Sequence, residues 1–310
     1  MTNQADRRDG SDCTRCEKFR ARLDESPQYA FKMTKEEARA KFAEMAARNE
    51  HDLELDGAAL LIAAEEYPHL EVEKYLDQLA SFAELAGRRD ERDADPLIRI
   101  TRLSNFLSDE LGFRGNVENY FDARNSFLND VIDRRTGIPI TLSVVYIEVA
   151  RRIGLQLFGV GMPGHFIVKY ADEEREVLID PFNGGRLLSE EKCREMIEEL
   201  YGGRMKFHPS LLRVVTKKQI LTRMLQNLKG IYARVGDQHK TLGVIERALL
   251  VNPDVTGEIR DRGLVYFGME RYAAALADLE EYLRRAPQAA DAKEVKERIK
   301  QLRQRQAQLN

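Results

Sequence analysis

Ile140-Thr-Leu-Ser-Val-Val-Tyr-Ile-Glu-Val-Ala-Arg-Arg-Ile153 is the stretch that decides the fold. Apolar residues occupy nearly every side of a helix drawn through it, which is typical of a helix that is buried all round. Pro139 stands at the start, where helices favour proline, and Gly154 is placed to end the helix. The stretch therefore predicts one central buried helix.

Three short strand-like runs follow this helix, at residues 155–160, 166–170 and 177–179. Turns that contain glycine follow the first and third runs, at residues 161–164 and 183–185, and turns this short join antiparallel strands. A buried helix followed by consecutive strands predicts an α+β fold, with the helix packed on an antiparallel sheet, rather than a doubly wound parallel sheet.

The region before the helix divides into two parts. Residues 1–33 are polar and lack apolar periodicity, which predicts a loose tail, with a short helix over residues 16–23 as an option. Residues 34–111 carry helical patterns and form a predicted helical N-terminal region. Thr34 and Glu37 have the spacing of a capping box at its start.

The last third of the chain is helical and repeats. Tyr232 and Tyr266 are 34 residues apart, and so are Pro253 and Pro287. This period resembles the tetratricopeptide repeat, in which each unit is a pair of antiparallel helices. We therefore divide the rest of the chain into an α+β core at residues 112–216 and two repeats with a capping helix at residues 217–310. The capping helix would present an apolar stripe of Ala292, Val295, Ile299 and Leu302.

Composition excludes several classes of protein. The 310 residues carry 49 basic and 52 acidic side chains, a net charge of −3, so charge gives no argument for binding nucleic acid. No uninterrupted apolar run is long enough for a membrane helix, and we predict no membrane partner. Three cysteines are an odd count in a chain that needs no disulfide staples, which indicates the reducing cytoplasm.

His165 and Asp180 are the first candidates for chemistry. A hairpin would bring these two residues together, and an aspartate that accepts a hydrogen bond from an imidazole leaves the other ring nitrogen as a general base. The alternative is a structural histidine and a turn-capping aspartate. Thr141 and Ser143, at the start of the buried helix, are weak nucleophile candidates, and the alternative for them is capping of helix amides.

Other polar residues are weaker candidates for a site. Asn129 and Glu148 could line a pocket, although a charge buried in the helix must be paired, and Arg151 or Arg152 could do this. Cys13 and Cys16 have zinc-like spacing, but no second pair lies nearby, so we predict no metal and no other cofactor.

Five motifs in order resemble the bacterial SirB family. They are Asn125-Ser-Phe-Leu-Asn129, Arg134-Arg-Thr-Gly-Ile-Pro-Ile140, Tyr146-Ile-Glu-Val-Ala-Arg-Arg-Ile-Gly154, Pro163-Gly-His-Phe166 and Ile179-Asp-Pro-Phe182. The resemblance extends from about residue 54 to the end of the second repeat. It implies a transglutaminase-like, papain-like core followed by tetratricopeptide repeats.

The same resemblance assigns roles to single residues. His165 and Asp180 match the catalytic histidine and aspartate of the transglutaminase-like superfamily. Gly137 matches the glycine before the superfamily's cysteine, which puts Pro139 near the cysteine position, so the usual nucleophile is absent.

These observations leave three functions open. The first is a regulatory or adaptor protein that binds a protein or peptide partner through residues 217–310 and the core cleft. The second is a hydrolase or acyl transferase that uses His165 and Asp180 with a hydroxyl or a water. The third is a structural adaptor whose cleft is filled.

Overall fold

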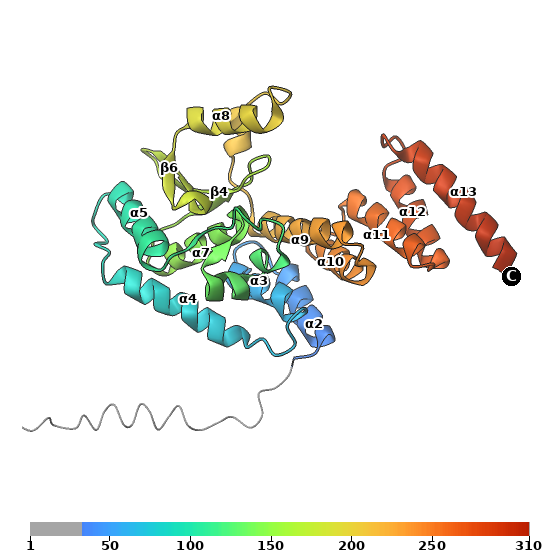
Figure 1. Cartoon of the computed structure of the whole chain (residues 1–310), viewed down its shortest axis with the longest axis horizontal. Coiled ribbons are helices and arrows are strands. Elements are labelled where there is room, and N and C mark those ends of the chain that lie inside the picture. The colour runs from blue at the N-terminus through green and yellow to red at the C-terminus, as the bar shows by residue number, and fades with distance from the viewer. Residues whose placement is uncertain (1–32, 310) are drawn as a thin grey trace, which may run out of the picture. The chain divides into compact units, whose positions relative to one another are not determined.

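The structure is a computed structural model that describes residues 33–309. The predicted tail, with its optional helix and Cys13 and Cys16, lies outside the described residues except for Met33. Four helices come first in the described part of the chain, and the last of them continues as a π-helical turn at Phe106–Glu110 (Figure 1). They are α2 (Lys35–Ala47), α3 (Leu55–Ala64), α4 (Val72–Gly87) and α5 (Pro96–Asn105).

The predicted capping box starts the first of these helices. The Glu37 backbone N–H donates to Thr34 Oγ1 over 3.1 Å, and the Thr34 N–H donates to Glu37 Oε2 over 2.7 Å. Two otherwise unpaired amides are satisfied in this way, so α2 begins where the sequence predicts.

The predicted central helix is α7 (Pro139–Arg152), and α6 (Leu128–Arg134) precedes it. Every residue from 139 to 150 is buried, which confirms the all-round burial predicted from the apolar pattern. The helix lies against α3, α4 and α6 and also against strands of the sheet. Pro139 occupies the first turn, where its missing N–H costs no helical hydrogen bond.

The main sheet is an antiparallel meander of four strands in the order β3-β4-β5-β6. The three predicted strands are present, and the sequence pattern missed the fourth, because it is only three residues long and is largely exposed. The strands are β3 (Phe158–Val160), β4 (Ile167–Ala171), β5 (Glu176–Asp180) and β6 (Arg186–Leu188).

A second, two-stranded parallel sheet joins β1 (Arg114–Gly115) to β2 (Thr136–Gly137). Gly115 is required there, because a Cβ atom would lie 2.6 Å from the Phe182 ring. The ring therefore packs directly on the strand backbone. Phe182 belongs to the 3₁₀ turn η3 (Pro181–Asn183), which follows β5.

The C-terminal helices form two hairpins and a further helix (Figure 1). Val295, Ile299 and Leu302 of the last helix are buried with Ala275 and Leu279 of the second hairpin, as the predicted apolar stripe requires. The helices are α9 (Lys217–Arg234), α10 (Gln238–Val251), α11 (Thr256–Gly268), α12 (Tyr272–Arg285) and α13 (Ala292–Leu309). Before them, α8 (Glu190–Tyr201) covers a small separate apolar cluster around Cys193.

One apolar core joins the N-terminal helices, the sheet and the first hairpin. It contains Phe42 of α2, Leu60 of α3, Tyr146 of α7 and Leu228 of α9, all fully or almost fully buried. Arg247 of α10 is buried at the same junction and donates to the Ile62 carbonyl over 2.8 Å. The first repeat is therefore packed against the transglutaminase-like part of the chain and shares its apolar core.

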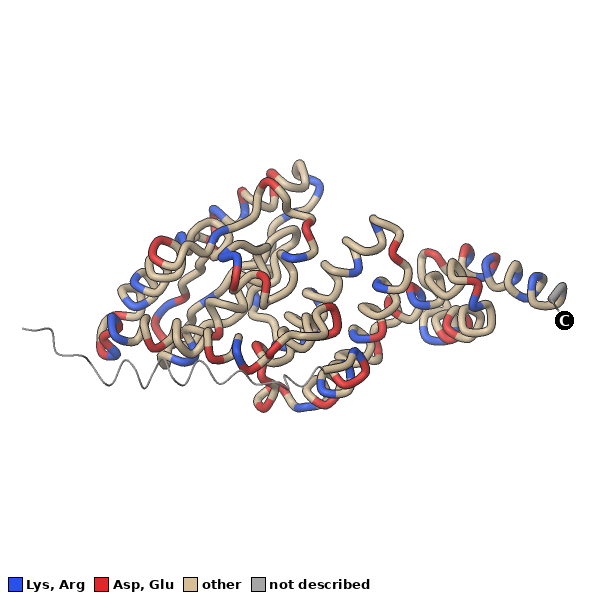
Figure 2. The backbone as a smooth tube through the Cα atoms, turned by 60° about the horizontal axis from the view of Figure 1, so that its bottom comes forward, with Lys and Arg blue, Asp and Glu red and all other residues tan. Residues whose placement is uncertain are grey.

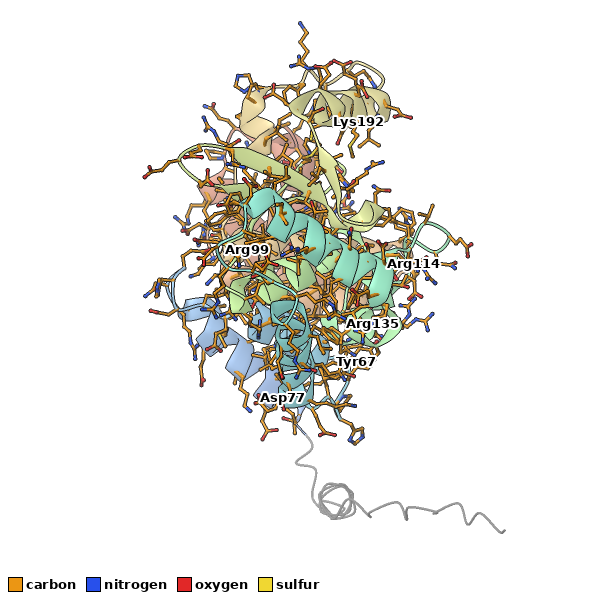
Figure 3. The ribbon with its side chains drawn as sticks, turned by 90° about the vertical axis from the view of Figure 1, so that its left-hand side faces the viewer. Tyr67, Asp77, Arg99, Arg114, Arg135 and Lys192 are labelled. Carbon is orange, nitrogen blue, oxygen red and sulfur yellow. The ribbon has the colours of Figure 1, made fainter. Side chains whose placement is uncertain are left out.

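Two further arginines contact the core. Arg99 is buried, and Arg135 is half-buried. Arg99 contacts Asp90 at 2.6 Å and donates to the Ile153 carbonyl at the end of α7, and Arg135 stacks on the Phe82 and Phe113 rings. Figure 3 labels both arginines. Along the surface elements, acidic and basic residues are interspersed (Figure 2). Within residues 33–309, every helix is too short or too polar to cross a lipid bilayer.

Candidate functional site

His165 and Asp180 meet at one end of the hairpin formed by β4 and β5. His165 lies just before β4, and Asp180 is the last residue of β5, which pairs with β4 in the register Val168 to Ile179. His165 Nε2 is 3.0 Å from Asp180 Oδ1. The imidazole is 13% exposed, whereas the carboxylate is fully buried. The predicted contact is therefore present, between a mostly buried imidazole and a fully buried carboxylate.

Asp180 is held by several donors in addition to His165. The Asn183 backbone N–H donates to Oδ1 over 3.3 Å, Asn183 Nδ2 donates to Oδ2 over 2.7 Å, and the Arg186 guanidinium lies 3.6 Å from Oδ2. Burial raises the pKa of Asp180, but the contact with His165, followed by those with Asn183 and Arg186, outweighs burial, and the pKa falls below its ordinary value. The carboxylate is therefore ionised at neutral pH and accepts from His165.

An ionised Asp180 fixes the tautomer of His165. The carboxylate can only accept, so Nε2–H donates to it, and in the neutral imidazole Nδ1 carries the lone pair. This arrangement leaves Nδ1 able to accept a proton or a hydrogen bond from a bound molecule.

The hydroxyls of Thr141 and Ser143 donate to backbone carbonyls and not to His165. Thr141 Oγ1 donates to the Asn125 carbonyl over 2.7 Å and accepts from the Ile138 N–H over 3.2 Å. Ser143 Oγ donates to the Pro139 carbonyl over 2.8 Å. Both side chains are fully buried, and neither is hydrogen-bonded to His165. The geometry matches the capping alternative for Thr141, which accepts from the Ile138 amide, whereas Ser143 bonds a carbonyl and caps no amide.

No thiol occupies the start of α7, where Pro139 stands. Cys193 is fully buried in the cluster under α8, and burial followed by the nearby charge of Asp180 raises its pKa to about 11. A thiol with such a pKa carries almost no thiolate at neutral pH. Cys193 is therefore an apolar core residue.

The two pocket candidates lie in different surroundings. Glu148 is buried and paired with Arg151 and Arg152, and the pKa of Glu148 is raised by burial and by the charge of Asp56. It lines a hollow of about 770 Å³ whose wall contains neither His165 nor Asp180, so the structure does not group Glu148 with the histidine. Asn129 is buried on α6, and its Oδ1 has no hydrogen-bond partner among the described residues.

Aromatic side chains extend from His165 to the surface. The Phe182 ring lies edge-on to the His165 ring, with centroids 6.0 Å apart, and Tyr120 contacts Phe182 at 6.1 Å. Tyr120 is 37% exposed, its neighbour Phe121 58% and Val117 76%. These residues belong to the loop of residues 116–122, which lines a hollow of about 560 Å³. An apolar, exposed edge therefore lies beside the histidine.

Asn125 holds this loop in place. Asn125 Nδ2 donates to the Asn119 carbonyl over 2.8 Å and to the Tyr120 carbonyl over 3.2 Å. Asn125 Oδ1 accepts from Asn116 Nδ2 over 3.0 Å. Because the same residue's carbonyl accepts from Thr141, Asn125 ties the loop to the start of α7.

Two arginines of α9 reach the same region. Arg223 donates to the carbonyls of Met162 and His165 over 2.9 and 2.8 Å, and so holds the turn that carries the histidine. The Arg234 guanidinium lies 3.9 Å from the Phe121 ring centroid. The first repeat helix therefore forms one wall of the site.

Two protein-family models match successive parts of the chain. Residues 73–226 match the transglutaminase-like superfamily, and residues 228–300 match the tetratricopeptide repeat. A UPF0162 protein of Xylella fastidiosa is 37% identical over 247 residues, which cover 78% of this chain and 88% of the relative. The chain belongs to the UPF0162 family.

Other relatives extend the comparison. A UPF0162 protein of Vibrio cholerae is 30% identical over 240 residues, covering 76% of this chain and 85% of the relative. F-box only protein 21 of Mus musculus is 34% identical over 150 residues, which are 44% of this chain and 22% of that protein. The predicted architecture of a transglutaminase-like core and tetratricopeptide repeats is thus confirmed for this UPF0162 member. Its assignment to SirB stays a prediction.

Sequence reasoning missed part of the site in this UPF0162 chain. The motifs that resemble SirB contain Asn125 and Phe182, but Phe121 and Arg223 were not predicted as site residues. The only available signal was two adjacent aromatics, Tyr120 and Phe121, in an otherwise polar loop. Within residues 33–309, no group of three or more histidine, cysteine or acidic side chains is arranged to hold a metal ion.

Proposed function

We propose that the chain is a protein- or peptide-binding regulatory adaptor whose transglutaminase-like core is a pseudoenzyme. The observation that carries the proposal is the commitment of the Thr141 and Ser143 hydroxyls to backbone carbonyls, with Pro139 at the start of α7. A site without a free nucleophile has no direct route to acyl transfer. A cytoplasmic location and the relationship to SirB are part of this proposal.

The exposed aromatic edge is the part of the core that we assign to the partner. Tyr120 and Phe121 offer rigid apolar contact area, and aromatic anchors of this kind carry much of the energy of protein interfaces. Arg234 lies over the Phe121 ring and Arg223 holds the turn that carries His165, and neither has a carboxylate partner among the described residues. An extended peptide segment laid over the loop of residues 116–122 and α9 would meet both features.

Replacing Tyr120 and Phe121 together with alanine should reduce partner recovery by about ten-fold or more, because each buried aromatic anchor contributes more than about 1 kcal/mol to binding. Affinity purification of the full chain followed by quantitative mass spectrometry measures the effect. Ile98→Ala, at an exposed position of α5, is the matched control. Equal recovery with the double variant and the control would show that this edge is not the binding surface.

A second function, hydrolysis with a water nucleophile, is favoured by the His165–Asp180 geometry. The free Nδ1 of His165 could take a proton from a water bound beside the aromatic edge. If peptide or ester substrates are turned over, His165→Ala should lower the rate by about 10²- to 10⁴-fold. His208→Ala changes an exposed histidine of a 3₁₀ turn and should leave the rate unchanged. Turnover that survives His165→Ala would exclude this function.

A further inference from the structure

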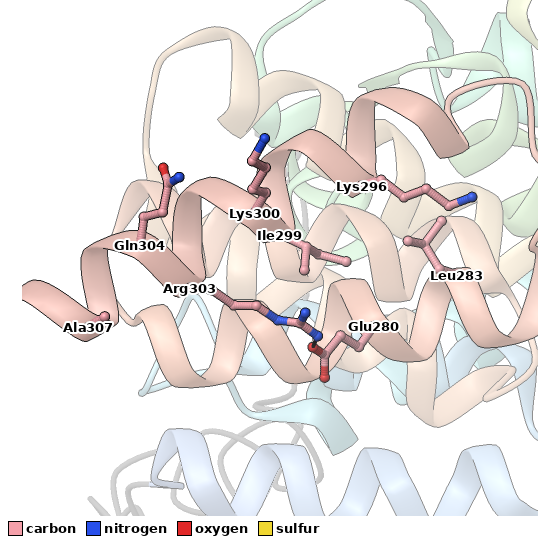
Figure 4. A pocket seen from close by; sticks show the side chains of 8 residues that line it. All are labelled: Glu280, Leu283, Lys296, Ile299, Lys300, Arg303, Gln304 and Ala307. Atoms are coloured by element: carbon pink, nitrogen blue, oxygen red, sulfur yellow. Dashed lines mark hydrogen bonds and ion pairs between the residues drawn. The ribbon is translucent and has the colours of Figure 1, made fainter.

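The last two helices enclose a groove that lies outside the His165 site. The groove between α12 and α13 is a hollow of about 640 Å³ (Figure 4). Its apolar side chains are Leu283 of α12 and Ile299 and Ala307 of α13. Its polar side chains are Glu280, Lys296, Lys300, Arg303 and Gln304.

One face of α13 along this groove is basic. Lys293, Lys296, Lys300 and Arg303 follow one another at spacings of three, four and three residues, which places them on one side of a helix. Arg303 reaches across to Glu280, with 2.6 Å between nitrogen and oxygen, while the Lys296 and Lys300 side chains extend away from that pair (Figure 4). Within residues 33–309, the three lysines form no ion pair.

The two other basic residues of α13, Arg298 and Arg305, lie over aromatic rings. Arg298 stacks on the Phe267 ring at 4.8 Å, and Arg305 lies over Phe267 and Tyr272 at 5.6 and 5.8 Å. These guanidinium groups cover aromatic surface of the second repeat. The lysines have no such contact, so their charge is available to a molecule in the groove.

The surroundings of α13 also differ from those of the other repeat helices. α9 pairs with α10 as a hairpin, and α11 pairs with α12. α13 packs on α12, and in the described part of the chain no helix pairs with its other side. The groove between α12 and α13 is likewise uncovered in the described part of the chain, and helices of partner proteins bind in apolar grooves of this kind.

We propose that the groove between α12 and α13 binds an acidic amphipathic helix of a protein partner. Carboxylates at successive turns of that helix match the spacing of Lys293, Lys296 and Lys300. Its apolar side chains contact Leu283 and Ile299. The inference rests on the proposed function, since it names the chemistry of a partner for the repeats, but it uses a different surface from Tyr120 and Phe121.

The probe is a synthetic, fluorescein-labelled peptide of ~18 residues, long enough for about five helical turns. It carries glutamate on one face and leucine on the other. Fluorescence anisotropy with the full chain measures the affinity. The double variant K296E/K300E should bind the peptide about ten-fold more weakly or worse, because attraction at two positions becomes repulsion.

The control variant K41E/K206E makes the same change in net charge at two exposed lysines outside the groove. It should change the affinity by less than about two-fold. A circular dichroism spectrum of each variant checks that the helices are intact. Added salt should weaken binding of the peptide to the wild-type chain, because the contacts between its glutamates and the lysines of the groove are ionic.

Three results would overturn the proposal. They are failure of the peptide to bind, equal losses in K296E/K300E and K41E/K206E, and tighter binding of a DNA duplex than of the peptide with the same dependence on Lys296 and Lys300. The alanine variant of Tyr120 and Phe121 separates the two proposals. If the groove fails but that variant still loses the partner, only the inference about the groove is wrong.

Discussion

Gly185→Ala is expected to lower the free energy of unfolding by about 3 kcal/mol, because alanine there meets both a backbone penalty and a steric clash. Gly185 has a φ of +70°, in the left-handed region that favours glycine. A Cβ atom would lie 2.6 Å from the Tyr146 hydroxyl and 2.6 Å from Ser104 Cβ. Both neighbours are buried, so neither can move away without disturbing α7 or α5.

The preceding residue provides a matched control. Gly184 has a φ of +75°, but no atom lies within 4 Å of the position that a Cβ would take. Gly184→Ala should therefore cost only the backbone penalty, about 1 kcal/mol. Urea unfolding followed by circular dichroism measures both values. Equal losses for the two variants would mean that contact with Tyr146 and Ser104 does not constrain the turn after Asp180.

The parts of the fold that the sequence predicts well depend on local patterns. The burial of α7 follows from apolar residues on all sides of the helix, and the repeats follow from tyrosines and prolines at a fixed period. The Thr34–Glu37 capping box follows from spacing alone. In each case the deciding residues lie within one or two elements, so a single sequence contains the information.

The features that the sequence did not predict depend on contacts between segments that lie far apart in the sequence. Gly115 approaches Phe182 across 67 positions of sequence, and Arg223 reaches the carbonyl of His165 from the first repeat helix. For neither residue does the sequence contain a pattern that predicts this contact. Glu148 shows the same limit, because its helical face was predictable but its surroundings, which include Asp56 of α3, were not.

Replacing Asp180 with alanine is expected to cost about 3 kcal/mol of stability, because it removes a fully buried anion that accepts hydrogen bonds from His165 and Asn183. Asn183 loses acceptors for both its backbone and its side-chain amide, and His165 loses the partner of Nε2. Differential scanning calorimetry or urea unfolding gives the value. Asp172→Ala is the control, since Asp172 also accepts two backbone amides but lies exposed in the β4–β5 turn. It should cost less than about 1 kcal/mol.

The conservative variant Asp180→Asn separates charge from shape and adds a dependence on pH. The folded-state pKa of Asp180 lies below its ordinary value, so ionisation contributes stability that is fully present above that ordinary value, about 4. This contribution is lost as the pH falls through the folded-state pKa. The part of the difference in unfolding free energy between the wild type and Asp180→Asn that comes from the Asp180 charge should therefore be lost as the pH falls below about 4. A difference that stays constant down to pH 2 would mean that the carboxylate charge does not hold His165. In that case the fixed tautomer, and the free Nδ1 on which the hydrolase alternative depends, would both have to be abandoned.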